Sequence, residues 1–300
     1  MNIIVGTRGS KLSLIQTDNV ILKLMKKAPH LNFNVKIIKT FGDRKSHKPL
    51  ISFKERGVFV KSLDKAVLEG KVDFAVHSMK DVPTKMLPKL KIVAVPKRGS
   101  AHDVLISRNN SKLKELPKDA VIGTGSPRRI AQIHSIRSDL KIKAIRGNVN
   151  TRLKKFIQKK FDGLVLAEVG LKRLNLQHYI TEYFSLDIFT PPPGQGALAV
   201  IAREDNFELI EILKKINHSS SMVSILAERT FIGKLGGGCK LPLGAYAKVK
   251  DNKLSLYASI LSPDGKIKIS TSKLGDPLNP ENLGLIVAED LIKKGALDII

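Results

Sequence analysis

The chain has one cysteine, no tryptophan and few aromatic residues, and each shortage narrows what the protein can be. One cysteine in 300 residues excludes an intramolecular disulfide and fits a reducing compartment. Aromatic residues make up only 5% of the chain, which leaves little for the stacking platforms that bind single-stranded nucleic acid. Even the apolar stretch 197–202 is much shorter than a membrane-spanning helix. The first residues have the pattern of a strand and not of a leader peptide, so we expect a cytoplasmic protein.

Acidic residues are also scarce. The chain has 27 of them and 52 basic residues, which gives a formal net charge of +25 at pH 7. Such a charge is compatible with binding nucleic acid, an anionic membrane or an acidic small molecule. Most of it comes from 39 lysines, which stand singly or in pairs along helix-like segments, as on a solvated surface. The 13 arginines are more informative, because a planar guanidinium group binds carboxylate or phosphate in a bidentate manner.

Two segments of the chain, which we call corners, have the same order of features: a strand, a Gly-Thr turn, a serine and a helix. The first leads from strand 3–5 to Ser10, which is expected to cap a helix over 11–27. The second, residues 121–126, ends on Ser126, and the proline that follows strengthens the predicted helix start. A helix N-terminus offers free N–H groups to an anion, although a merely capped helix explains either corner by itself.

Strands alternate with helices over the first two thirds of the chain, which predicts βαβ units in mostly parallel sheets. Segment 162–167 echoes 73–78, and this weak repeat predicts two similar α/β domains around a shared cleft. The first helix is expected to turn one stripe towards its core, formed by Leu12, Ile15, Asn19, Leu22 and Met25.

A proline-rich segment, 191–196, is expected to be a stiff hinge. The strand that follows, 197–201, is expected to return to the first domain. From about residue 219 the chain predicts a helix, alternating strands around 244–250 and 253–261, and a final helix over 282–295. These elements indicate a small α+β domain.

Cys239, the only cysteine, follows three glycines and precedes Lys240. Glycine lacks a Cβ atom, so the thiol is presented and not packed, and the lysine favours the thiolate. A lone cysteine is more often a small buried hydrophobe, so the local sequence leaves both interpretations open. His77 ends a predicted strand, and we expect a structural role for it because no second His or Cys lies at ligand spacing.

Arginine is concentrated where predicted strands end or helices begin. Randomly placed surface arginines are not expected to collect there, so the pattern favours a pocket for a molecule with several carboxylates or phosphates. Six of the 13 arginines have such positions, namely Arg8, Arg128, Arg129, Arg146, Arg152 and Arg173.

Together, these motifs resemble those of the porphobilinogen deaminase (hydroxymethylbilane synthase) family over essentially the whole chain. A Gly-Gly-Cys motif alone is weak, but several specific motifs in the same order are a strong signal. The matching motifs are residues 7–10, 77–83, 123–129, 146–149, 170–173, 194–196 and 237–239.

The resemblance implies a deaminating transferase of tetrapyrrole (haem-type) biosynthesis, which joins four porphobilinogen molecules head to tail into hydroxymethylbilane and releases ammonia. It also implies a covalent dipyrromethane cofactor, one per chain, attached through a thioether to Cys239 as a primer. Asp81 is implied as the catalytic carboxylate. The acetate and propionate groups of cofactor and substrate are then expected to bind Arg8, Ser10, Ser78, Lys80, Thr124, Ser126, Arg128, Arg129, Arg146, Arg152 and Arg173.

The residue types agree with that chemistry. Loss of ammonia from porphobilinogen leaves an electron-poor ring, so positive charge develops on the pyrrole nitrogen. A fixed carboxylate such as Asp81 stabilises this charge most strongly in the transition state and can also move protons. The alternative for Asp81 is a helix or turn cap.

The resemblance further implies three domains, of which the first two are α/β and similar to periplasmic binding proteins around a cleft. Domain 1 is expected to cover 1–96 with 197–216, and domain 2, with the arginine-rich cleft wall, 97–196. Domain 3 is expected to cover 217–300 as a small α+β domain with the cysteine loop. We expect no metal, no nucleic-acid or membrane partner, and a monomer.

The chain departs from the family in the 43–57 loop, where Lys54-Glu55-Arg56-Gly57 stands in place of the usual Gly-Gly-Lys-Gly. Phe59 still follows, at the position expected to stack on a pyrrole. Two other functions stay open at this point, a two-domain binding protein for a small anion and a nucleic-acid binder. The glycine-presented cysteine argues against the first, and the scarcity of aromatic residues argues against the second.

Overall fold

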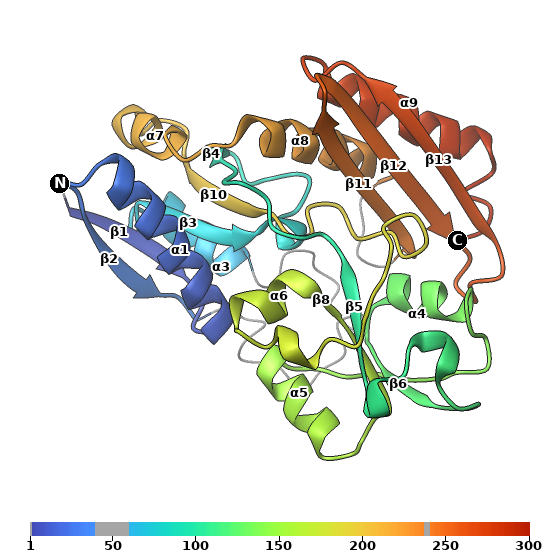
Figure 1. Cartoon of the computed structure of the whole chain (residues 1–300). Helices are drawn as coiled ribbons and strands as arrows, with labels where there is room; N and C mark the ends of the chain where they lie inside the picture. Colours follow the sequence, from blue (N-terminus) through green and yellow to red (C-terminus); the bar gives the residue numbers. More distant parts are fainter. Residues whose placement is uncertain (1, 40–59, 237–240) are drawn as a thin grey trace. The chain divides into compact units, whose positions relative to one another are not determined.

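The structure is a computed structural model that describes residues 2–39, 60–236 and 241–300. It contains two compact units, and each of them is discontinuous in sequence (Figure 1). Unit 1 comprises Met1–Gly99 and Gly196–Met222, and unit 2 comprises Ser100–Gln195 and Val223–Ile300. The chain therefore passes between the units three times. The division into three domains stays a prediction.

Unit 1 is built on a five-stranded sheet in the order β2-β1-β3-β10-β4. Strand β10 is the strand that was expected to return to the first domain, and its place between β3 and β4 confirms this prediction. The elements of unit 1 are β1 (Asn2–Thr7), α1 (Lys11–Lys27), β2 (Asn32–Ile37), α3 (Lys61–Leu68), β3 (Phe74–Ser78), the short 3-10 helix η2 (Met79–Asp81), β4 (Leu90–Ala94), β10 (Leu198–Arg203) and α7 (Phe207–Lys214).

The face that α1 turns inward differs from the predicted stripe. Leu22 and Met25 remain 55% and 45% exposed, whereas Gln16 and Thr17 are buried beside Val20, Ile21 and Leu24. The two polar side chains can lie inside because each finds a partner there. Gln16 bonds the side chain of Ser78, and the Thr17 hydroxyl donates to that of Thr7 over 2.8 Å. The apolar pattern alone could not reveal these partners.

The first half of unit 2 is built on a second five-stranded sheet, in the order β7-β6-β8-β5-β9. Its strands and α-helices are β5 (Asp103–Ser107), β6 (Val121–Gly123), α4 (Pro127–His134), β7 (Lys141–Lys143), α5 (Val149–Ile157), β8 (Gly163–Ala167), α6 (Glu168–Arg173) and β9 (Glu182–Tyr183). Three 3-10 helices join them, η3 (Arg108–Asn110), η4 (Leu113–Glu115) and η5 (Gln177–Tyr179).

The two five-stranded sheets have the same design, which confirms the repeat seen in the sequence. In each sheet a strand that runs into a helix, β1 or β6, pairs in parallel with both of its neighbours. In each sheet the fourth strand, β10 or β5, is antiparallel to the strands on both sides. Four of the five strands in each sheet therefore run in the same direction and one is reversed, which agrees with the expectation of mostly parallel sheets. The reversed strands are β10 and β5. The chain reaches β10 only after it has passed through unit 2, and β5 is the first strand of its unit, so neither strand follows a βαβ crossover.

The C-terminal part of unit 2 is a three-stranded antiparallel sheet of β11 (Leu243–Lys250), β12 (Lys253–Leu261) and β13 (Lys268–Gly275). Helix α9 (Pro280–Lys293) lies along this sheet, as Figure 1 shows, and α8 (Ser219–Lys234) contributes Ala227 and Phe231 to the same core. Gly284 of α9 lets the helices approach closely, because a Cβ atom there would lie 2.6 Å from the Ala227 carbonyl oxygen. This is the small α+β region that the sequence predicts, with β13 as an additional strand.

Within unit 2, the segment before residue 195 joins the sheet of β11–β13 to α4. Thr190 is fully buried, and its hydroxyl accepts a hydrogen bond from Ser259 of β12 over 2.9 Å. Its carbonyl oxygen accepts bonds from Arg128 and Gln132 of α4. Glu228 of α8 accepts a bond from the Gly194 N–H over 2.6 Å. The predicted hinge segment is thus tied down on several sides within unit 2.

No helix in the described part of the chain is long and apolar enough to cross a membrane.

Candidate active site

Asp81 lies on η2, directly after strand β3, at the edge of the unit 1 sheet where that strand ends. The backbone fixes this position at both ends of η2, because Met79 N–H donates to the Ala197 carbonyl and Val82 N–H to that of Met79. Asp81 itself is exposed. A small cavity of about 20 Å³ adjoins it, and the residues that line this cavity are Arg8, Ser13, Gln16, Val60, Val76, His77, Ser78 and Asp81.

The first corner, residues 7–10, contributes Arg8 to the lining of this cavity. Ser10 caps α1 as predicted, since its hydroxyl accepts a bond from the Ser13 N–H over 3.2 Å. Thr7 is fully buried and donates from its hydroxyl to the Ser13 carbonyl over 3.3 Å. These bonds fix the turn that carries Arg8, so unit 1 brings together Arg8, Ser78 and Asp81.

Gln16 belongs to the same site, and sequence reasoning missed it. Its amide group bonds the Ser78 hydroxyl, with Nε2 3.1 Å and Oε1 3.4 Å from Oγ. The residue is only 5% exposed. A signal for it existed, because a polar side chain on the inner face of a capped helix needs an interior partner.

In unit 2 the second corner has the predicted cap. Ser126 precedes α4, and its hydroxyl accepts a bond from the Arg129 N–H over 3.5 Å. The Ser126 N–H in turn donates to the hydroxyl of Thr124, which is buried, over 3.3 Å. The corner is therefore held by side chains on both sides of the turn.

Asp103 of β5 is the centre of a buried network in unit 2 that the sequence did not reveal. Its carboxylate accepts bonds from Arg128 over 2.6 Å, from Arg129 over 2.7 Å and from Gln195 over 3.0 Å. Burial raises the pKa of Asp103, but the charges of Arg128 and Arg129 outweigh it and hold the pKa well below its usual range. One signal was present, because an acidic residue at the start of an apolar run such as 104–106 needs a buried partner.

Arg128 uses its guanidinium group inside unit 2. Besides Asp103, it donates from Nη1 to the Thr190 carbonyl and to Gln132 Oε1, each over 2.7 Å. The residue is 4% exposed, and burial lowers the pKa of Arg128 although Asp103 acts in the opposite direction. Its predicted contact with a carboxylate of the substrate stays a prediction, and its present contacts join α4 to β5 and to residue 190.

Arg129 is oriented by the same carboxylate. It donates from Nη2 to Asp103 and from Nη1 to the Val165 carbonyl over 2.9 Å. Its Nε atom is buried and has no hydrogen-bond partner among the described residues. Arg129 therefore keeps one buried donor that no described residue uses.

Arg152 lies close enough to Arg129 and to Arg146 for their charges to repel its own. Burial, followed by the charges of Arg129 and Arg146, lowers the pKa of Arg152 to about 10. Burial lowers the pKa of Arg173 to about 10 as well, and that of Arg146 in the same direction. Among the described residues, no acidic group contributes to the shift of the pKa of Arg152.

This arrangement fits a ligand with several carboxylates. Buried and half-buried positive charges that repel one another are costly in the free protein, and anionic groups that bind there relieve the repulsion. The bond from Arg152 Nε to the Gly147 carbonyl, over 2.8 Å, fixes the side chain before any ligand arrives. The donor set has the chemistry that a dipyrromethane with its acetate and propionate groups requires.

The structure places the predicted residues in two groups, one in each unit. The group in unit 1 contains Arg8, Ser10, Ser78, Lys80 and Asp81. The group in unit 2 contains Thr124, Ser126, Arg128, Arg129, Arg146, Arg152 and Arg173. Cys239 and Phe59 lie outside the described residues.

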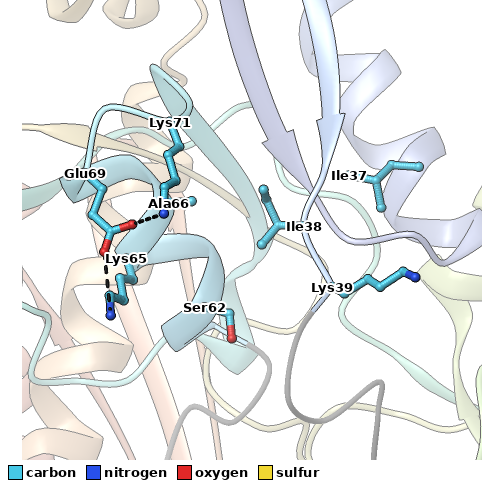
Figure 2. A pocket seen from close by; sticks show the side chains of 8 residues that line it. All are labelled: Ile37, Ile38, Lys39, Ser62, Lys65, Ala66, Glu69 and Lys71. Atoms are coloured by element: carbon cyan, nitrogen blue, oxygen red, sulfur yellow. Dashed lines mark ion pairs between the residues drawn. The ribbon is translucent and has the colours of Figure 1, made fainter.

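A larger hollow in unit 1, of about 380 Å³, contains none of the predicted site residues. It lies between the end of β2 and α3 and is lined by Ile37, Ile38, Lys39, Ser62, Lys65, Ala66, Glu69 and Lys71 (Figure 2). Figure 2 shows Glu69 paired with Lys65 and Lys71, at 3.5 Å and 2.6 Å. No three His, Cys, Asp or Glu side chains in the described segments come together as a metal site.

Curated relatives match this chain over nearly its full length. A probable porphobilinogen deaminase of Nitrosopumilus maritimus is 43% identical over 299 residues, which cover 100% of this chain and 96% of the relative. The porphobilinogen deaminase of Alkaliphilus metalliredigens is 42% identical over 296 residues, 99% of this chain and 94% of the relative. Among solved structures, a periplasmic binding protein of Salmonella typhimurium with high arginine specificity matches with a TM-score of 0.40. Its sequence identity is 15%, and the match covers 71% of this chain and 90% of that chain.

Two family models account for most of the sequence. Residues 3–211 match the model described as porphobilinogen deaminase, dipyromethane cofactor binding domain. Residues 222–293 match the model of the porphobilinogen deaminase C-terminal domain. The chain belongs to the porphobilinogen deaminase family.

Proposed function

We propose that this chain is a porphobilinogen deaminase, which condenses four porphobilinogen molecules into the linear tetrapyrrole hydroxymethylbilane and releases ammonia. The match of both family models along the chain carries this conclusion. The arginine cluster of unit 2 supports it, because each pyrrole ring of substrate and product carries two carboxylates that need guanidinium partners.

The enzyme uses a dipyrromethane cofactor, in agreement with the family model for residues 3–211. When bound, this group supplies the terminal pyrrole carbon to which the first substrate molecule is joined. We assign its covalent attachment to the Cys239 thiol. Its carboxylates are assigned to Arg129, whose buried Nε donor has no hydrogen-bond partner among the described residues, and to Arg146, Arg152 and Arg173, with Thr124, Ser126 and Arg128 completing the site.

Asp81 is assigned to the chemical step. As ammonia leaves the substrate, positive charge grows on the pyrrole nitrogen, and a fixed carboxylate stabilises that charge more in the transition state than before it. The same carboxylate accepts the proton that leaves the new ring junction. Arg8, Ser10, Ser78 and Lys80 are assigned to the carboxylates of the incoming substrate, and Phe59 to stacking on its pyrrole ring.

Intact-mass measurement of the purified protein tests this function together with a porphobilinogen assay. The wild-type chain should carry a covalent two-pyrrole adduct, and Cys239→Ala should carry none and be inactive. The variant Asp81→Asn should fold and carry the adduct, yet lose about 10²- to 10⁴-fold in turnover. An active protein of unmodified mass contradicts the cofactor assignment, and near-normal turnover of Asp81→Asn removes that residue from the chemical step.

Two other functions make different predictions in the same assays. A binding protein for a small anion would bind porphobilinogen without releasing ammonia. A nucleic-acid binder would retain DNA with an affinity that falls steeply with salt, since a net charge of +25 permits contacts with many phosphates. A monomeric state and a cytoplasmic location belong to our proposal as well, and light scattering of the purified protein tests the first.

A further inference from the structure

A buried pair of polar side chains joins α3 to β3, the strand that leads into Asp81. The Nε2 atom of His77 lies 3.1 Å from Oδ1 of Asp64, and each side chain is only 3% exposed. The two atoms make a close polar contact and not a hydrogen bond, and neither has a hydrogen-bond partner among the described residues. Burying a carboxylate costs free energy unless a donor group lies close to it. Each of the two side chains therefore stabilises the other in the interior.

The pair joins two elements next to the site. His77 is on β3, four residues before Asp81, and it lines the same small cavity as Asp81. Asp64 is in the first turn of α3, which has no side-chain cap of its own. The backbone of β3 is fixed on both sides by β1 and β10, and two helices pack on the strand: α1, whose Gln16 bonds Ser78, and α3, whose Asp64 contacts His77.

The sequence lets α3 lie close to the sheet at this point. Gly6 of β1 has no side chain, and a Cβ atom there would lie 2.7 Å from Cδ1 of Leu63, the neighbour of Asp64. Leu63 is fully buried. Because the helix is packed directly against the sheet, a small displacement of Asp64 or His77 also displaces the end of β3.

We propose that Asp64 and His77 are positioning residues for Asp81: the carboxylate of Asp64 fixes the His77 ring with Nε2 protonated, and the fixed ring sets the end of β3 and η2. This inference rests on the proposed function, since it gives Asp81 the role in the chemical step. Neither residue touches the reacting atoms. Their loss should therefore reduce kcat and leave substrate binding and cofactor attachment in place, because misplacement of a reacting group by about 1 Å costs up to about 100-fold in rate.

Four variants separate a positioning role from the alternatives. Asp64→Asn removes the charge with little change in shape and should lower kcat by about 10- to 100-fold, with KM within about twofold. His77→Leu should have the same effect. His77→Gln keeps an N–H donor near the place of Nε2 and should retain at least about a third of the wild-type kcat. Glu69→Gln, on the same helix but in a surface ion pair with Lys65 and Lys71, should leave kcat unchanged.

The outcomes are distinguishable from a failure of the proposed function. Wild-type kcat in both Asp64→Asn and His77→Leu, while Asp81→Asn is inactive, overturns the positioning role and leaves the function intact. Equal losses in His77→Gln and His77→Leu also overturn it, because an N–H donor that faces Asp64 then makes no difference to kcat. Near-normal turnover of Asp81→Asn contradicts the role of Asp81 on which the inference rests.

A spectroscopic measurement tests the inference even where a variant is poorly stable. In the wild-type protein, ¹⁵N spectra of His77 should show a proton on Nε2. In Asp64→Asn the signal should shift towards a mixture of the two tautomers. A wild-type spectrum with the proton on Nδ1 contradicts the proposed contact.

Discussion

Asp103 determines how the arginines at the start of α4 can be held in the interior. It is fully buried and accepts bonds from Arg128 and Arg129, so that two positive charges share one negative charge. Gln195 adds a third bond from the segment that leads back to unit 1. Without the carboxylate, both guanidinium groups would lie in the interior without a counter-charge, which is strongly unfavourable.

We therefore expect Asp103→Asn to destabilise the protein by about 3 to 5 kcal/mol. The same variant should also lose carboxylate binding, because Arg129 loses the group that orients it. Urea unfolding of the apo protein measures the first effect. Glu211→Gln is a suitable control, since Glu211 forms an exposed pair with Lys214 and should change the stability by less than about 0.5 kcal/mol. A stability equal to that of the wild type would falsify the central role of Asp103.

The pH dependence of this effect follows from the direction of the shift. The pKa of Asp103 is lower in the folded protein than in the unfolded chain, so its stabilising contribution is fully present above the unfolded value of about 3.9. The contribution fades as the pH falls further towards the folded value. The difference in unfolding free energy between wild type and Asp103→Asn should be constant from neutral pH to about pH 5 and shrink below about pH 4.

The two corners that precede α1 and α4 use glycine for the same purpose. A Cβ atom at Gly6 would lie 2.7 Å from Leu63, and one at Gly123 would lie 2.5 Å from Leu164. In both places, strands β1 and β6 are packed directly against apolar side chains. The repeat therefore extends from the cap and turn to the close packing behind the strand.

Replacing either glycine by alanine should destabilise the protein by about 1 to 3 kcal/mol, because the added methyl group overpacks a tight contact. Gly6→Ala should also lower kcat, since it displaces Leu63 and with it Asp64. Gly233→Ala is the matched control. Gly233 lies in α8, and apart from its own helix backbone no described atom lies within 4 Å of its Cβ position, so alanine there should stabilise the helix by about 0.5 to 1 kcal/mol. Thermal unfolding of the three variants decides between these outcomes, and a stabilised Gly6→Ala contradicts the packing argument.

The elements that the sequence predicted well are those with strong local signals. The caps Ser10 and Ser126, the repeat of the two corners and the return of β10 depend on residue types that act over a few positions. The collection of arginines at strand ends was visible for the same reason. Asp81 was placed through its motif, and the structure agrees that it follows directly on β3.

The features that could not be predicted depend on partners far away in the sequence. Gln16 is buried because Ser78, 62 residues later, accepts its hydrogen bond. The inner face of α1 therefore contains Gln16, and Leu22 and Met25 stay exposed. Arg128 was expected at a ligand, but its present contacts are with Asp103, Gln132 and Thr190. Periodicity reports apolar faces, and it contains no information on polar groups that satisfy one another in the interior.

The net charge of +25 is large for a chain of this length, and most of it is lysine. Porphobilinogen has two carboxylates and one ammonium group, so it is attracted by a positive field. Such a field raises the encounter rate and is screened by salt. The lysines of α5 and the turn after it are on the same segment as Arg152, which makes them suitable for local steering.

We expect kcat/KM for porphobilinogen to fall about 3- to 10-fold as ionic strength rises from about 0.01 M to about 0.15 M, with little change in kcat. Neutralising three lysines near the arginines, in the triple variant Lys154→Gln, Lys159→Gln and Lys160→Gln, should reduce this salt dependence. The matched triple variant Lys248→Gln, Lys250→Gln and Lys253→Gln removes the same charge from the β11–β12 hairpin and should keep it. If the two triple variants have the same salt response, the field of the whole molecule, and not its local pattern, attracts the substrate.

The place of β10 in its sheet has a consequence for the synthesis of the chain. Strands β3 and β4 are made early, but the strand between them is β10, which follows about 100 residues after β4. At translation rates of roughly 5 to 20 residues per second, the nascent sheet keeps a gap of one strand for about 5 to 20 s. The second sheet uses only strands between Asp103 and Tyr183, so all its strands leave the ribosome before β10 does. The five-stranded sheet that is begun first is thus the one that is completed last, and its open strand edges need protection from aggregation on the ribosome during that interval.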